Sequence, residues 1–335
     1  MDEVQRTEKY AKRPLDEQRV AQMNQLLLPA QAALERDAPE PAQPIVLVIG
    51  APRAGTTLAG QMLAATGGFA YASNFLARFW QTPAVGAIIE QALKIRDNDG
   101  IDFSSTHGVT KGWSNSHEFG YYWSAWFDRG QATHRLTPAQ LAQIDAVAVR
   151  RSLGALEAVR QLPFVFKNNT WCTLQASYLA QTLPTSLFVV CRRNPLFIAQ
   201  SILMARRERY GDEKQWWSVR PSTYETITQY SPHQQVVFQA LEIQREMDDE
   251  LRQVAPHRLI HAPYERLCAE PRHIIAEVVE RCESSGVKLT LERTCPETFD
   301  STDVRRLPAN EWNLLERALE DYPAFRARIE SQTWS

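Results

Sequence analysis

The residues Gly-Ala-Pro-Arg-Ala-Gly-Thr-Thr at positions 50–57 have the composition of a loop that binds phosphate. They follow directly on the apolar run 45–49, which is typical of a buried strand, and a helical pattern comes after them. At such a junction the backbone N–H groups that open the helix point at the ligand, and the helix dipole favours a negative charge. The residues expected to bind it are Arg53, Ala54, Gly55, Thr56 and Thr57.

The positive side chain of this loop does not stand where loops for nucleoside triphosphates have it. A loop for nucleoside triphosphates carries Lys directly after its second Gly, where Thr56 stands here, and the positive side chain appears three positions earlier, at Arg53. The missing Lys is the residue that reaches the β- and γ-phosphates beside a bound Mg²⁺. The displacement therefore argues against a triphosphate and favours group transfer without a metal.

A second apolar run, 186–191, leads into another corner with a cation, Arg193. Pro195 is a favoured residue for the first turn of a helix, and Ser201 lies about two turns along that helix. Since Arg makes bidentate contacts with phosphate, Arg193 and Ser201 are suited to hold one phosphate group together.

The two loops, in this order, resemble those of the sulfotransferases that use 3′-phosphoadenosine 5′-phosphosulfate (PAPS). In that family the first loop binds the 5′-phosphosulfate, and an Arg-Asx-Pro motif followed by a Ser binds the 3′-phosphate. The resemblance gives the first role to residues 53–57, with Arg53 among the catalytic residues, and the second role to Arg193 and Ser201. It implies PAPS as co-substrate, a hydroxyl acceptor and no metal.

Four further positions can be compared with the family, and two of them depart from its pattern. Lys167, at the end of the apolar run 164–167, corresponds to the residue that steadies the bridging oxygen of the sulfuryl donor. The catalytic His of the cytosolic relatives, expected two residues later, is replaced by Asn169. Tyr264 corresponds to a residue near the adenine, whereas Leu58 stands where many relatives have an adenine-stacking Trp.

Another residue must then accept the proton of the acceptor. Sulfotransferases that modify glycans use a Glu in an aromatic segment after the first helix, and on that resemblance Glu118 is the predicted base, with His117 second. The neighbouring aromatic residues can raise basicity by excluding water. The other interpretation is an ordinary Glu in the first turn of a capped helix. His107, in a stretch rich in Ser, Thr and Gly, is the poorer candidate.

Strands near 45–49, 164–167, 187–191 and 258–262 alternate with helical patterns at 136–160 and 234–254, which predicts a parallel sheet with helices on both faces. The fold class is α/β, a three-layer α/β/α architecture similar to that of the P-loop NTPases.

Residues 1–43 are predicted to form a helical extension that packs on the domain or on a partner subunit, which leaves a homo-oligomer open. Residues 44–335 are predicted to form a single domain. An insertion near 206–232, rich in Arg and aromatic residues, is either a lid over the acceptor or an excursion whose Trp pair packs in the core.

Composition narrows the class of partner. The formal net charge of −2 provides no basic field for nucleic acid. Five cysteines without metal-ligand spacing fit a reducing, cytoplasmic compartment, and no apolar run approaches the length of a transmembrane segment. The aromatic segments suit a small molecule, a glycan or a lipid head group as acceptor.

Two other functions stay open. A P-loop kinase or nucleotide hydrolase with an altered loop would need a carboxylate for Mg²⁺ at a strand end, where the sequence has Lys167 and Arg193. A catalytically inactive nucleotide-binding protein is the other alternative, and Asn169 in place of His is its best support.

Overall fold

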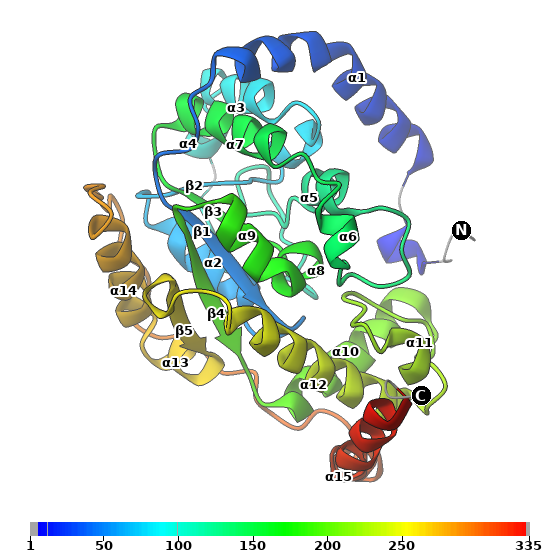
Figure 1. The fold of residues 1–335 in the computed structure, drawn as a ribbon. Helices are drawn as coiled ribbons and strands as arrows, with labels where there is room; N and C mark the ends of the chain where they lie inside the picture. The colour runs from blue at the N-terminus through cyan, green and yellow to red at the C-terminus, as the bar shows by residue number, and fades with distance from the viewer. Residues whose placement is uncertain (1–5, 12, 99, 333–335) are drawn as a thin grey trace.

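A computed structural model describes residues 6–11, 13–98 and 100–332, and its centre is a parallel sheet of five strands in the order β2-β3-β1-β4-β5 (Figure 1). The strands are β1 (Ile45–Gly50), β2 (Ala70–Tyr71), β3 (Phe164–Lys167), β4 (Ser186–Arg192) and β5 (Leu259–Pro263). The four strands predicted from sequence are present. The two-residue β2 is too short to leave a pattern in the sequence.

Strand β1 shows why the sheet needs helices on both sides. All six of its residues are buried, and alternate side chains point to opposite faces of a strand. Val46 and Val48 enter one apolar core, whereas Leu47 and Ile49 enter another. The predicted three-layer α/β/α architecture is therefore confirmed.

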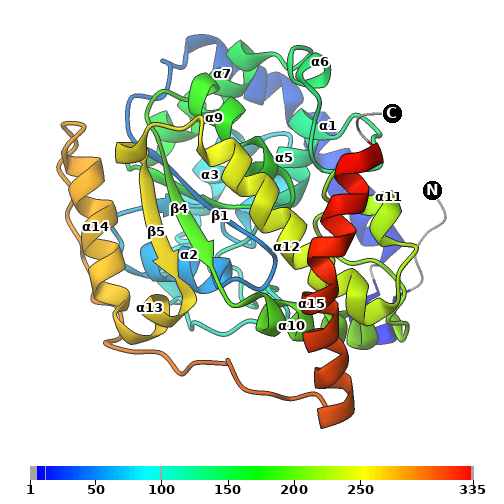
Figure 2. The ribbon, with the colours of Figure 1, turned by 60° about the horizontal axis from the view of Figure 1, so that its bottom comes forward.

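The first face is covered by the helices that contribute to the core of Val46 and Val48. They are α2 (Thr56–Ala65), α10 (Pro195–Tyr210), α11 (Tyr224–Ile227), α12 (Pro232–Leu251), α13 (Tyr264–Ala269), α14 (Pro271–Glu283) and α15 (Ala309–Gln332). Helix α15 packs along α10 and α12, and a long segment without helix or strand connects it to α14 (Figure 2).

The second face is covered mainly by helices from the first half of the chain. They are η2 (Leu76–Phe79), α3 (Pro83–Ala92), α5 (Gly120–Phe127), α6 (Pro138–Leu141), α7 (Ala146–Arg160), α8 (Asn169–Cys172) and α9 (Ala176–Thr182). The remaining elements are η1 (Glu8–Tyr10), α1 (Pro14–Asp37), α4 (Ile95–Asn98), η3 (Thr173–Gln175) and η4 (Pro256–Arg258).

Helix ends follow the capping residues of the sequence. Asn194 accepts the N–H of Leu196 at 2.9 Å at the start of α10, and Ser231 forms a capping box with Gln234 at the start of α12. The single helix expected over 136–160 is wrong, because Asp145 accepts the N–H of Ala148 at 2.9 Å and starts a new helix there.

Helix α1 packs on α3 and α7 mainly through polar side chains. The carbonyl oxygen of the Gln31 side chain accepts the N–H of Ala84 at 3.0 Å in the first turn of α3, and Asn24 accepts the N–H of Gln81 at 3.0 Å. Leu26 of this helix is 74% exposed, so it does not contribute to the packing. Within the described ranges, no helix combines the length and the apolar character needed to cross a bilayer.

The connection from α1 to the sheet makes a close contact with α7, and this contact gives a test of the packing. A Cβ atom on Gly154 would lie 1.9 Å from the carbonyl oxygen of Pro39. Gly154→Ala should therefore destabilise the protein by about 1–3 kcal/mol, although Ala alone favours a helix by up to about 1 kcal/mol.

Urea unfolding measures this, with Gly120→Ala as the control, because a Cβ on Gly120, the first residue of α5, would meet nothing within 4 Å. An unfolding midpoint of Gly154→Ala equal to or above that of the native sequence would contradict the packing described.

Candidate active site

Three parallel strands end at one edge of the sheet and bring the predicted site residues together. Strand β1 lies between β3 and β4, with Val48 opposite Lys167 and Gly50 opposite Cys191. The loop 51–55, Lys167 and Arg193 therefore gather beyond the carboxyl ends of the strands. Open α/β sheets bind their ligands at such a place.

The loop after β1 has the backbone that a close ligand requires. Gly55 has φ 95°, and a Cβ there would lie 2.8 Å from Cδ2 of Tyr264, so only Gly fits. The first N–H groups of α2 have no partner within the helix and are available to an anion. Ala54 is fully buried beneath the loop, so its side chain serves packing.

Asn169, which replaces the expected catalytic His, fixes this loop by two hydrogen bonds of its side chain. Its side-chain oxygen accepts the hydroxyl of Thr56 at 3.0 Å, and its Nδ2 donates to the carbonyl oxygen of Ala51 at 3.2 Å. Both ends of the loop are thus fixed by one side chain on α8.

Arg53 is the cation of the loop and is partly buried. Its Nε donates to the Ser201 hydroxyl at 2.8 Å, and Ser201 reaches the site through this bond. Burial, together with the charge of Arg193, lowers the pKa of Arg53 to about 10, which leaves it charged at neutral pH. Arg53 forms no ion pair with a carboxylate in the described part of the chain.

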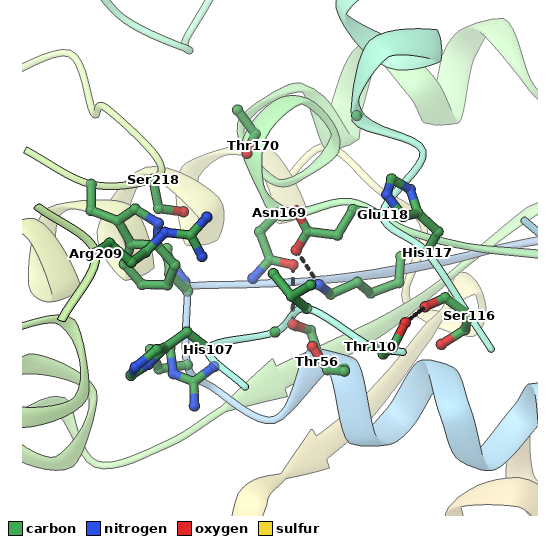
Figure 3. Close-up of a pocket in the computed structure, with 18 residues that line it drawn as sticks. Thr56, His107, Thr110, Ser116, His117, Glu118, Asn169, Thr170, Arg209 and Ser218 are labelled. Atoms are coloured by element: carbon green, nitrogen blue, oxygen red, sulfur yellow. Dashed lines mark hydrogen bonds and ion pairs between the residues drawn. The ribbon is translucent and has the colours of Figure 1, made fainter. Parts of the chain in front are cut away.

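Two cavities flank the loop and share Arg53, Thr56 and Thr57. The first cavity also contains Lys167, Glu118, His117 and Asn169 (Figure 3). The second is lined by Gly55, Arg193 and Tyr264. Apart from Ala54 and Ser201, the predicted residues thus divide between two cavities beside the predicted phosphate-binding loop.

Glu118 and Lys167 form an ion pair in the first cavity. Burial opposes ionisation of Glu118, but the Lys167 ammonium and its hydrogen bond outweigh burial and hold the pKa of Glu118 below its ordinary value. Helix α5 begins only at Gly120, so the alternative of a first-turn Glu is wrong. The segment is fixed by the N–H of His117, which donates to the carbonyl oxygen of Ala72 at 2.7 Å.

His117 is held in one tautomer. Its Nδ1 accepts the N–H of Phe119 at 2.9 Å, so in the neutral ring the proton is on Nε2. His117 lies at the exposed rim of the cavity, and desolvation by the surrounding protein lowers its pKa below the ordinary value of about 6.5, so the ring is neutral at pH 7. The free ring nitrogen is therefore a hydrogen-bond donor and is not available to accept a proton.

In the second cavity Arg193 stacks on Tyr264, with its guanidinium carbon 4.1 Å from the centre of the ring. Arg193 also donates to Asp303 at 2.6 Å and to the hydroxyl of Thr302 at 2.9 Å. The long segment between α14 and α15 thus reaches the site through residues that sequence reasoning missed. No motif in that segment distinguishes them.

Gly108 and His107 are further residues of the first cavity that sequence reasoning missed or ranked low. A Cβ on Gly108 would lie 3.8 Å from both the Arg53 guanidinium and the Lys167 ammonium, so this loop closes on the cations. His107 lines the same cavity and pairs with Glu208. The one sequence signal for this loop is its Gly, whose φ of 81° suits no other residue well.

A model of the sulfotransferase family matches residues 44–286, and the chain belongs to that family. Among solved structures, sulfotransferase STF9 from Mycobacterium avium is similar at 13% identity and a TM-score of 0.50, covering 93% of this chain and 78% of that one. Sulfotransferase STF1 from Mycobacterium tuberculosis H37Rv is 14% identical with a TM-score of 0.48, and the match covers 81% of this chain and 73% of that one. At these identities the likeness shows the fold alone. No curated protein matches the chain in sequence.

The described residues contain no group of three or more His, Cys, Asp or Glu side chains placed to hold a metal ion. The charged groups around the loop are instead mostly cations. Such a site is suited to an anionic ligand that brings its own negative charge.

The ion pair of Glu118 predicts how its carboxyl titrates. In Lys167→Met the strongest influence that lowers the pKa of Glu118 is removed, and only the weaker influences of His117 and Arg209 still oppose burial, so this pKa should rise from its lowered value. A carbon-13 NMR titration of Glu side-chain carboxyls measures this, and Glu118→Gln identifies the signal.

Lys111→Met is the control, since Lys111 is exposed and lies outside this cavity. A pKa of Glu118 that is the same in Lys167→Met as in the native protein would rule out the pairing.

Proposed function

We propose that the protein transfers the sulfuryl group of PAPS to a hydroxyl group of a small-molecule, glycan or lipid acceptor. The observation that carries this proposal is the first cavity, where Arg53, Lys167 and Glu118 face the same loop that opens α2. An anion cradle, a cation for the leaving group and a carboxylate are the parts that in-line sulfuryl transfer needs.

The proposed donor spans the two cavities across the loop. The 5′-phosphosulfate lies on residues 53–57, and the 3′-phosphate lies between Arg193 and Ser201, with the adenine near Tyr264. Support comes from the shared lining of the cavities and from Arg193, whose contact with Asp303 shows that it already binds one anionic group. The 3′-phosphate takes the place of Asp303 on Arg193.

The chemistry breaks one bond to sulfur and forms another. The acceptor oxygen attacks sulfur, the bond from sulfur to the bridging oxygen breaks, and adenosine 3′,5′-bisphosphate leaves. Glu118 takes the hydroxyl proton of the acceptor, and Lys167 stabilises the charge that develops on the bridging oxygen. The neutral ring of His117, whose Nε2 is a donor, orients the acceptor oxygen.

Lys167 links donor binding to the strength of the base. In the free protein its ammonium pairs with Glu118 and makes that carboxylate a weak base. When Lys167 turns to the bridging oxygen, burial raises the pKa of Glu118, so the base becomes stronger when the donor is in place.

The other two functions are less well supported. A kinase or hydrolase needs a carboxylate for Mg²⁺ at a strand end, and β3 ends in Lys167 while Arg193 follows β4. An inactive protein was suggested by Asn169, but Asn169 holds the loop and Glu118 supplies a carboxylate beside it. All five cysteines are free thiols, which suits the cytoplasm that we propose as its location.

Thermal unfolding with adenosine 3′,5′-bisphosphate tests the proposed donor site. A ligand at a hundred times its dissociation constant adds about 2.7 kcal/mol, which is a rise of several degrees in Tm. Arg193→Gln should lose most of this rise. Its neighbour Arg192 pairs with Asp248 on α12 and lies outside both cavities, so Arg192→Gln should keep it.

The same measurement with ATP and Mg²⁺ completes the test. A rise in Tm with ATP and Mg²⁺ but not with the bisphosphate would overturn the sulfotransferase proposal in favour of a kinase.

Removing the base tests the proposed mechanism. Glu118→Gln should lower kcat by about 10²–10⁴ without weakening bisphosphate binding, and His117→Gln should cost only a few-fold. Transfer of ³⁵S from labelled PAPS to a mixture of phenols and sugars measures turnover. Full activity of Glu118→Gln would show that another group accepts the proton.

A further inference from the structure

The first cavity has a second polar wall, which the proposed chemistry leaves unused. Arg209, His107 and Ser218 lie on one side of the cavity, whereas Glu118 and His117 lie on the other, with Asn169 between them (Figure 3). This wall comes from the end of α10 and from two loops. It faces the place where the acceptor must sit.

Arg209 is held in this wall by aromatic rings. Its guanidinium carbon lies 4.7 Å from the ring centre of Tyr10 and 5.8 Å from that of Trp217. Stacked rings fix the plane of a guanidinium and leave its edge free for hydrogen bonds. The side chain is thus positioned before any ligand binds.

The charge of Arg209 has no carboxylate partner in any ion pair of the described residues, and its buried Nε has no hydrogen-bond acceptor there. The buried Nδ1 of His107, on the same wall, also has no partner. Buried polar atoms without a partner are uncommon, and these two show that the protein does not itself satisfy the polar groups of this wall.

The adjacent carboxylate, Glu208, is held away from Arg209 by other donors. It accepts hydrogen bonds from Lys9 at 2.5 Å and from the hydroxyl of Tyr10 at 2.8 Å, and it pairs with His107. The N–H of Thr7 donates to the carbonyl oxygen of Arg209 at 2.8 Å, which fixes the N-terminal segment on α10. The N-terminal segment thus donates hydrogen bonds to Glu208 from Lys9 and Tyr10, and the ring of Tyr10 also contacts the Arg209 guanidinium.

Among the described residues, the lining of the first cavity contains three cationic side chains, Arg53, Lys167 and Arg209. Lys167 pairs with Glu118, and Arg53 lies in the loop proposed for the phosphosulfate. Arg209 is the remaining cation, on the wall opposite Glu118 (Figure 3). Its planar guanidinium matches two oxygens of a carboxylate, phosphate or sulfate.

We propose that Arg209 binds an oxyanion of the acceptor, so that the substrates are anionic hydroxyl compounds. The acceptor presents its hydroxyl to Glu118 and a carboxylate, phosphate or sulfate group to Arg209 across the cavity. This inference rests on the proposed function and specifies the class of acceptor. A contact of Arg209 with the transferring sulfuryl group is the competing explanation.

Matched pairs of probes test this assignment without requiring turnover. The pairs are 4-hydroxyphenylacetate with its methyl ester, and p-nitrophenyl β-D-glucuronide with p-nitrophenyl β-D-glucoside. Calorimetry measures their binding to protein saturated with adenosine 3′,5′-bisphosphate. At least one acid should bind the native protein about tenfold to a hundredfold more tightly than its neutral partner.

Arg209→Gln should remove this preference and leave the neutral probes unchanged, whereas Arg209→Lys should keep part of it. Arg207→Gln is the matched control, because Arg207 lies on the same helix, pairs with Glu213 and Glu311, and lines neither cavity. It should keep the full preference. Binding of the bisphosphate to each variant shows that the variant is folded.

Equal binding of acid and neutral probes to the native protein, or an unchanged preference in Arg209→Gln, would overturn the inference while the donor site stands. A loss of PAPS affinity in Arg209→Gln without any acid preference would assign Arg209 to the sulfuryl group and overturn it as well. Failure of the native protein to bind the bisphosphate is a different result, since it removes the proposed function itself.

Discussion

The parallel sheet forces three cations together, and much of the site follows from that constraint. Arg53 and Arg193 follow β1 and β4, and Lys167 ends β3; the carboxyl ends of these strands share one edge. Like charges in a partly buried place repel strongly unless anions compensate them. Glu118 and Asp303 supply such anions from segments far apart in sequence, which explains why those segments close over the edge. Among the residues that the structure describes, Arg53 pairs with no carboxylate and donates to the neutral Ser201 hydroxyl, so the compensation is incomplete in the loop itself.

The position of the carboxylate depends on a strained residue beside it. Phe119 has φ 52°, an uncommon conformation for an aromatic residue, and it is fully buried. Its ring stacks on Tyr122 at 4.7 Å and lies parallel to Phe166 of β3 at 6.5 Å between centres. The aromatic segment therefore anchors the turn that points Glu118 at Lys167. It does so by packing, whereas the sequence interpretation expected it to act by excluding water.

What the sequence predicted was local, and what it missed depends on contacts between distant segments. The loop 50–57 could be predicted because strand, glycines and helix are continuous in sequence. The break in the pattern 136–160 was missed because one capping residue, Asp145, outweighs a continuous helical pattern. The contacts of Asp303 with Arg193 and of Tyr10 with Arg209 join residues at least 110 positions apart, and no local pattern indicates them.

Helix α10 connects the two halves of the site. Ser201 on this helix holds Arg53 of the proposed donor loop, and Arg209, eight residues later, lines the cavity proposed for the acceptor. At 1.5 Å per residue the helix separates these positions by about 12 Å along its axis. A rigid helix thus sets the distance from the donor loop to the acceptor wall. The other residues of that wall, His107 and Ser218, lie outside regular α-helix and strand, as do Tyr10 and Trp217, whose rings contact Arg209. Substitutions are tolerated best in such segments. In the proposed arrangement, acceptor preference can therefore change by substitution in this wall while the strand ends proposed to bind the donor stay as they are.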